Sequence, residues 1–180
     1  EKAILTSRCI DRPIRPLFPK DLRNDCTVVA TVMSVDPDCS PEIAAMIGVS
    51  AAIAISDIPW DGPISGVNVG LVDGEIVINP TLEQRAKTDL NLTVASTADL
   101  IAMIEAGGNE IDDDTMFNAI MAGHEENKKI VKFIQGIVDE VGKPKFEYES
   151  SDPDPEIMKE IEDFCIEDVK KALDTDDKLV

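Results

Sequence analysis

Hydrophobic and polar residues follow two different periods along this chain, and the changes of period predict its elements. Apolar residues at helical spacing predict four helices, over residues 2–10, 43–55, 115–141 and 156–173. Runs that are rich in β-branched residues or alternate in polarity predict five strands, over residues 27–35, 67–72, 75–78, 90–95 and 100–105. The first of these strands is the densest in β-branched residues, and we expect it to be buried. Strands mixed with helices indicate an α/β (α+β) domain.

Residues with special backbone chemistry mark where these elements begin and end. Ser40 is the expected N-cap of the second helix, with Pro41 at the favoured first position. Asp73 and Gly74 lie between two β-rich arms and predict a tight hairpin, because glycine accepts the positive φ that such a turn requires. Gly107-Gly108 is expected to end the last strand.

The acidic, proline-containing stretch after the third helix predicts a linker. We expect an α+β domain over residues 1–146, a linker over 147–155, and the start of an all-helical domain over 156–180. Glu1 already belongs to a helical pattern, and no clear stop signal follows the last helix. The chain is therefore expected to be a piece of a longer polypeptide.

Composition and charge narrow the classes of function. The 180 residues are 43% hydrophobic with a net charge of −19, which argues against general nucleic-acid affinity. Residues 1–25, however, carry six basic and four acidic groups, so a polyanion should bind at this end.

No apolar run is long enough to span a bilayer. The four cysteines form no C-x-x-C pair, which argues against zinc and predicts reduced, mostly buried thiols in a cytoplasmic protein.

Three arginines in the basic segment are the candidate binding residues. Arg8, Arg12 and Arg15 follow one another at intervals of four and three, which places them along one side of a helix. Guanidinium groups suit phosphate because their planar fork donates two parallel hydrogen bonds. The alternative, favoured slightly by spacing alone, is that Arg12 pairs with Asp11 or another carboxylate and ties down a loop.

The string from Ser7 to Pro19 resembles the S-R-x-I-D-R-P-I-R-P-L-F-P signature of the polynucleotide phosphorylase family. Further similar stretches follow in the same order, at residues 30–36, 44–48, 58–64, 79–81 and 123–125. Short motifs of this kind are weak alone, but several in one order over about 145 residues are a specific signal.

The resemblance implies both a fold and a function. Members of this family are trimers whose subunits contain two RNase PH-like halves, a helical domain between them, and KH and OB-type RNA-binding domains. They degrade RNA from the 3′ end with inorganic phosphate, release nucleoside diphosphates reversibly, and use Mg²⁺ or Mn²⁺; they can belong to RNA-degrading assemblies. The resemblance places this chain in the later part of the first half, a β-α-β-α domain with no catalysis of its own that lines the RNA path, followed by the start of the helical domain.

The remaining chemical candidates have structural interpretations. The stretch Leu100–Gly108 lacks the alternating aspartates of the family's active half, and Glu105 alone offers too few oxygens for a divalent cation. Asp112, Asp113 and Asp114 precede a helix and suit its dipole. His124 has no nucleophile beside it in sequence and is expected to be a structural, hydrogen-bonded histidine. No catalytic or metal-binding residue is therefore predicted.

Two other functions stay open. The acidic excess and the missing carboxylates also suit a non-catalytic RNA-binding or oligomerisation module with no activity of its own. A stand-alone RNA-binding domain of ribosomal-protein type would share the β-α-β-α arrangement, but it would not explain the long series of motifs.

Overall fold

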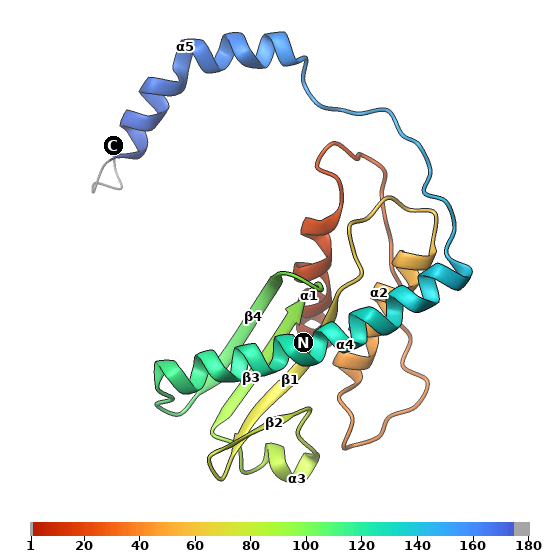
Figure 1. Cartoon of the computed structure of the whole chain (residues 1–180), viewed down its shortest axis with the longest axis vertical. Helices are drawn as coiled ribbons and strands as arrows, with labels where there is room; N and C mark the ends of the chain where they lie inside the picture. The colour runs from red at the N-terminus through yellow and green to blue at the C-terminus, as the bar shows by residue number, and fades with distance from the viewer. Residues whose placement is uncertain (1, 175–180) are drawn as a thin grey trace. The chain divides into compact units, whose positions relative to one another are not determined.

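The computed structural model describes residues 2–174 and divides the chain into two compact units. The first unit contains the chain up to residue 20 and residues 25–147; the second contains residues 21–24 and the chain from residue 148 onward. The elements of the first unit, in chain order, are α1 (Lys2–Ile14), the short 3₁₀ helix η1 (Arg15–Leu17), α2 (Pro41–Ile55), β1 (Ser65–Val72), β2 (Glu75–Ile78), α3 (Leu82–Arg85), β3 (Leu90–Ser96), β4 (Ile101–Gly108) and α4 (Asp113–Val141) (Figure 1).

The four strands form one antiparallel sheet in the order β2-β1-β3-β4. The predicted hairpin is present: Asp73 has φ 52° and Gly74 has φ 81°, as a tight turn between twisted strands requires. Strand β4 continues through Gly107 and Gly108, which pair with Asn91 and Leu90 of β3. The prediction that these glycines end the strand is wrong, because a paired neighbour holds their backbone extended.

Helix α4 crosses one face of the sheet, and the contact buries a hydrophobic layer (Figure 1). Strand residues of alternating position contribute to it, namely Val67, Val69, Leu92 and Val94, all at most 1% exposed. Ala119 of α4 packs against them. Gly123 lies closest to the sheet, since a Cβ built there would meet Val94 Cγ2 at 3.0 Å and Val69 Cγ2 at 3.1 Å. Small residues on α4 thus set how near the helix lies.

A second hydrophobic cluster joins α1, α2 and the far end of α4. Met46 of α2 is fully buried, and Trp60 packs against Phe18 with ring centroids 6.2 Å apart. The Trp60 indole N–H donates to the Ile14 carbonyl at 3.1 Å, which fixes the end of α1. Helix α1 ends at Ile14, one turn beyond the predicted end at residue 10, and Pro13 lies in its last turn.

Helix α4 begins, as expected, with acidic residues at its N-terminus. Asp112 is its N-cap, and its carboxylate accepts from the Thr115 backbone N–H at 2.9 Å. Hydrogen bonds from the Thr115 side chain and then from its backbone lower the pKa of Asp112. Ser40 is the N-cap of α2, but its hydroxyl donates to Glu42 Oε2 at 2.7 Å instead of accepting from the helix backbone.

The expected buried strand over residues 27–35 is absent. The segment has no regular secondary structure and is exposed, with no strand pairing in the described chain (Figure 1). Its sequence has strand propensity, but a strand also needs a neighbour to pair with, and the sheet ends at β2 and β4 without reaching it.

The expectation of mostly buried cysteines is also wrong: Cys26 and Cys39 are exposed, and Cys9 and Cys165 are partly buried.

Up to residue 174, the second unit contains one helix, α5 (Pro155–Leu173). The Asp154 carboxylate accepts from the Glu156 backbone N–H at 2.8 Å and caps it. Before the helix, the Tyr148 hydroxyl donates to Asp21 Oδ1 at 2.8 Å. Hydrogen bonds from Ser150 and Tyr148 lower the pKa of Asp21. The predicted domain boundaries stay a prediction, and residues 175–180 of the expected helical domain lie outside the described residues.

No helix within residues 2–174 combines the length and the apolar character that a membrane span requires.

Candidate functional site

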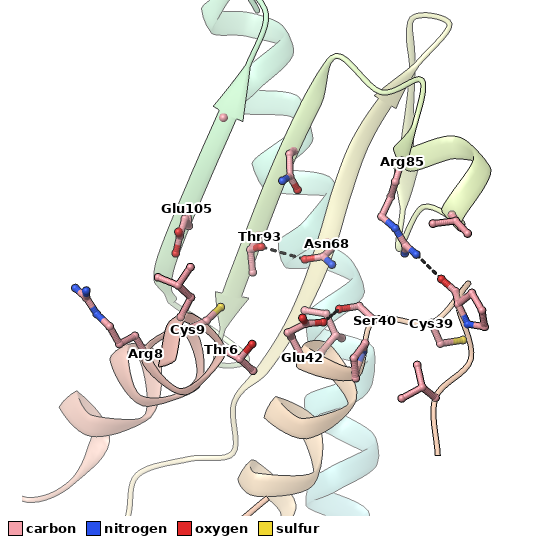
Figure 2. A pocket seen from close by; sticks show the side chains of 18 of the residues that line it. Thr6, Arg8, Cys9, Cys39, Ser40, Glu42, Asn68, Arg85, Thr93 and Glu105 are labelled. Carbon is pink, nitrogen blue, oxygen red and sulfur yellow. Dashed lines mark hydrogen bonds between the residues drawn. The ribbon is translucent and has the colours of Figure 1, made fainter. Parts of the chain in front are cut away.

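The predicted arginine segment borders a cavity of about 970 Å³ in the first unit. The cavity lies on the face of the sheet that α4 leaves uncovered, between α1, the start of α2 and the segment 35–40 (Figure 2). Because strand side chains alternate between faces, the residues next to the buried valines and leucines point into it. Its floor is polar, with Asn68 from β1, Asn91 and Thr93 from β3, and Glu105 from β4.

Hydrogen bonds order the polar floor of the cavity. Asn68 and Thr93 are opposite each other in the β1–β3 pairing, and the Thr93 hydroxyl donates to Asn68 Oδ1 at 3.0 Å (Figure 2). The Asn68 backbone N–H donates to Asn79 Oδ1 at 3.0 Å, which joins the floor to the end of β2. These contacts fix the Asn68 amide, so its orientation is set before any ligand binds.

Two of the three predicted arginines line the cavity, and each is exposed. Arg12 lies beside Glu105, with 3.6 Å between Nη1 and Oε2, and the two side chains are 53% and 63% exposed. An ion pair this open to solvent contributes little and can exchange for another anion. Arg8 extends from α1 toward solvent and forms no ion pair with any residue in 2–174 (Figure 2). Both guanidinium groups are therefore accessible to an anionic ligand.

Arg15 is placed differently from the other two arginines. Its guanidinium binds the Asp11 carboxylate in a bidentate fashion, with Nε 3.0 Å from Oδ2 and Nη2 2.8 Å from Oδ1. Arg15 is not among the residues that line the cavity. Asp11 thus pairs with Arg15 and not with Arg12, while Arg12 pairs with another carboxylate, Glu105, as the structural alternative allowed.

Sequence reasoning missed a third arginine at the cavity. Arg85, at the end of α3, donates to the Pro80 carbonyl at 2.8 Å and to the Pro37 carbonyl. It therefore ties the segment that forms one wall of the cavity to the sheet (Figure 2). No local pattern marks Arg85, because Pro37, whose carbonyl it binds, is 48 positions away in sequence. The polar floor of the cavity could have been predicted from the sequence, because apolar and polar residues alternate along Leu90–Val94.

The cavity offers polar contacts but little reactive chemistry. Burial raises the pKa of the Cys9 thiol, and the nearby Glu105 carboxylate raises it further, which leaves less thiolate near neutral pH. Within residues 2–174 no three His, Cys, Asp or Glu side chains are grouped to hold a metal ion. Three carboxylates line the cavity, and each already has a partner: Glu105 pairs with Arg12, Glu42 accepts from the Ser40 hydroxyl, and Asp36 accepts from the Asp38 backbone N–H.

His124 lies in α4 and packs on the face of the sheet opposite the cavity. It is 5% exposed, and its Nδ1 is 2.9 Å from the Ser96 hydroxyl oxygen. The neighbouring Asn127, fully buried, donates to the Val94 carbonyl at 3.0 Å. This placement agrees with the predicted structural role, because both side chains fasten α4 to β3.

Comparison with known proteins decides the family. Residues 1–59 match domain 1 of the 3′ exoribonuclease family, and residues 62–126 match domain 2 of the same family. The chain belongs to the 3′ exoribonuclease family. The two matches meet between α2 and β1, so the arginine segment lies in the first family domain and the sheet in the second.

Individual members of the family are closely similar to the chain. It is 61% identical over 99% of its length to a polyribonucleotide nucleotidyltransferase of Ruminiclostridium cellulolyticum, and 56% identical over 99% to one of Clostridioides difficile. It covers 25% and 26% of these two proteins, so it spans about a quarter of their length. The solved structure of rice Rrp46 superposes with a TM-score of 0.52 over 58% of this chain and 51% of that one, at 16% identity. That likeness supports the RNase PH-like fold.

Proposed function

We propose that the full-length protein containing this chain is a phosphate-dependent 3′-to-5′ exoribonuclease, a polyribonucleotide nucleotidyltransferase. It would transfer the 3′-terminal nucleotide of RNA to inorganic phosphate, release a nucleoside diphosphate, and run in either direction. The observation that carries the proposal is the 61% identity over 99% of the chain to a protein of that name. We further propose that this enzyme is a homotrimer, that it works in the cytoplasm, and that it can join an RNA-degrading assembly.

Within that enzyme, we propose that this chain provides scaffold and RNA path. Arg8 and Arg12 present two exposed guanidinium groups at the cavity, and guanidinium binds phosphate oxygens bidentately. Arg15 would contribute less, because the Asp11 carboxylate already accepts from its Nε and Nη2. The acidic remainder of the chain would keep RNA from binding elsewhere.

The divalent cation of the reaction, Mg²⁺ or Mn²⁺, does not fit this chain. A hard cation needs several oxygen ligands close together, and no three His, Cys, Asp or Glu side chains are grouped in this way within residues 2–174. We therefore place the cation and the catalytic residues in the part of the full-length polypeptide outside these 180 residues. No catalytic residue is assigned here.

The activity has a direct test. Full-length protein incubated with poly(A), inorganic phosphate and Mg²⁺ is expected to release ADP, measured by anion-exchange chromatography, and to release none when phosphate is omitted. The 180-residue chain alone is expected to release no ADP, because it lacks a carboxylate cluster for the cation. ADP release by the 180-residue chain would refute the catalytic silence of this part. Absence of ADP release by the full-length protein would leave the second candidate, a non-catalytic RNA-binding or oligomerisation module.

The arginine contacts have a separate test in the full-length protein. The double variant Arg8→Ala/Arg12→Ala is expected to bind single-stranded RNA roughly tenfold more weakly, because two phosphate contacts are lost. The slope of log affinity against log salt concentration should become shallower by about 0.7 for each contact. Fluorescence anisotropy of labelled oligo(A) over a salt series measures both.

The matched control for the arginines is Lys128→Ala. Lys128 is a cation on α4, away from the cavity, and pairs with Glu125. Its removal should leave RNA affinity and the salt slope unchanged. Equal losses in Lys128→Ala and in the double variant would show a general charge effect and contradict the assignment of Arg8 and Arg12.

A further inference from the structure

Helix α2 ends without the usual features of a helix C-terminus. Its last residue, Ile55, is followed by Ser56 and Asp57, so no glycine is there to turn the chain, and no basic residue lies in the last turn. Ser56 donates to the Ile53 carbonyl, from its backbone N–H at 3.2 Å and from its hydroxyl at 2.7 Å. The last carbonyls of a helix have no partner within it, so those of residues 54–57 depend on donors from elsewhere in the chain.

Residues 143–146, which directly follow α4, form a strap across this end of α2. The backbone N–H of Lys143 donates to the Ile55 carbonyl at 3.0 Å, and the backbone N–H of Phe146 donates to the Asp57 carbonyl at 2.8 Å. The strap lies outside residues 1–59 and 62–126, the two ranges that match the family domains. The end of α2 therefore depends on a stretch of chain beyond both matches.

Lys145 supplies the other donors of the strap and its charge. Its ammonium donates to the Ala54 carbonyl at 2.9 Å and to the Ser56 carbonyl at 2.7 Å, across 91 and 89 positions of sequence. A cation at the C-terminus of a helix opposes the negative end of the helix dipole. Burial lowers the pKa of this ammonium, and the nearby Asp57 carboxylate counteracts the shift. With the two backbone donors, the strap satisfies four consecutive carbonyls.

The end of α4 directs the chain into the strap. Gly142 follows the helix with an extended backbone, φ −64° and ψ 146°, and its N–H donates to the Val138 carbonyl at 2.8 Å. A Cβ built at Gly142 would overlap the same carbonyl oxygen, so glycine permits this exit. Pro144, inside the strap, has no backbone N–H and cannot continue the helix. The two residues thus end α4 where the strap begins.

We propose that the strap is the C-terminal cap of α2, and that Lys145 is the positioning residue that holds the end of α2 to the end of α4. The linker that follows the strap would then leave the first unit from a fixed point. At its other end, α2 brings Glu42 to the cavity, so the strap also holds that wall from the opposite end of the helix. The inference rests on contacts inside the first unit and does not depend on the proposed activity.

Backbone order parameters from NMR relaxation of the 180-residue chain test the strap. Lys145→Met keeps the aliphatic stem of the side chain and removes the charged donor. In this variant the order parameters of the Lys143 and Phe146 amides are expected to fall from about 0.85 to below roughly 0.6, because the strap comes away from α2. Those of β3 should stay near ~0.85, since β3 is paired on both sides. Unchanged order at Lys143 and Phe146 would overturn the proposal, and so would an equal fall in β3.

Two further variants separate the ammonium of Lys145 from general effects. Lys145→Arg keeps a positive charge and several N–H donors, so the strap should stay as ordered as in the unchanged chain. Lys143→Ala removes a neighbouring lysine side chain but keeps the backbone N–H that binds Ile55, so it should change nothing either. A strap as mobile in Lys145→Arg as in Lys145→Met would contradict the role of the charged donor. A mobile strap in Lys143→Ala would contradict the assignment to Lys145, because any loss of positive charge here would then release it.

Discussion

Gly123→Leu is expected to lower the free energy of unfolding of this chain by about 2 kcal/mol or more. Even a Cβ at this position would lie 3.0 Å from Val94 Cγ2 and 3.1 Å from Val69 Cγ2, both on the buried face of the sheet. A leucine side chain has no space unless α4 moves away from β1 and β3. Urea denaturation followed by circular dichroism measures the change, and an unchanged slope would show that the unfolded surface is the same.

The control for this prediction is on the same helix. A Cβ at Gly136 would meet nothing within 4 Å, and the position is exposed. Gly136→Leu should therefore raise the free energy of unfolding by about 0.5 kcal/mol, because leucine is a better helix former than glycine. If Gly123→Leu proved as stable as Gly136→Leu, the close approach of α4 to the sheet would be wrong.

His124→Ala is expected to cost about 2 kcal/mol of stability. The substitution empties a site that is 5% exposed and removes the partner of the Ser96 hydroxyl, 2.9 Å away. Thermal denaturation of the 180-residue chain measures the loss. In the full-length protein, RNA affinity measured below the Tm should stay unchanged, because His124 lies on the face of the sheet opposite the cavity.

Glu125→Ala provides the comparison for His124. Glu125 is the next residue of α4, 61% exposed, and pairs with Lys128 at 2.7 Å. Exposed ion pairs of this kind contribute little to stability, so the Tm of the Glu125→Ala variant should differ from that of the unchanged chain by about 1 °C or less. A loss of RNA affinity in His124→Ala without a loss of Tm would point to a functional role and contradict the structural one.

Local patterns predicted the elements whose stability is mainly local. The Asp73-Gly74 turn, the Asp112 cap and the apolar stripe of α4 each involve residues close in sequence, and each is present. The same logic failed for residues 27–35, because strand formation depends on a partner that no local pattern reveals. Gly107 and Gly108 show the converse, since pairing with β3 keeps a weak strand sequence extended.

The candidate site was predictable only in part for a related reason. The spacing of Arg8 and Arg12 indicated a common side, and both line the cavity. Spacing could not reveal that Asp11 would bind Arg15 or that Glu105, 93 residues from Arg12, would lie beside it. Arg85 was missed because its role depends on a carbonyl 48 residues away.

The order of strands also has a consequence for how the first unit folds. Strand β1 pairs with β2 and β3 pairs with β4, each its next strand in sequence, so these pairings close short loops. The contact between Trp60 and Ile14 closes a loop of 46 residues and carries a larger entropic cost. The sheet can therefore assemble before α1 docks on it. The cavity, which needs both, would be completed late, and an anion bound between α1 and the sheet would slow the undocking of α1.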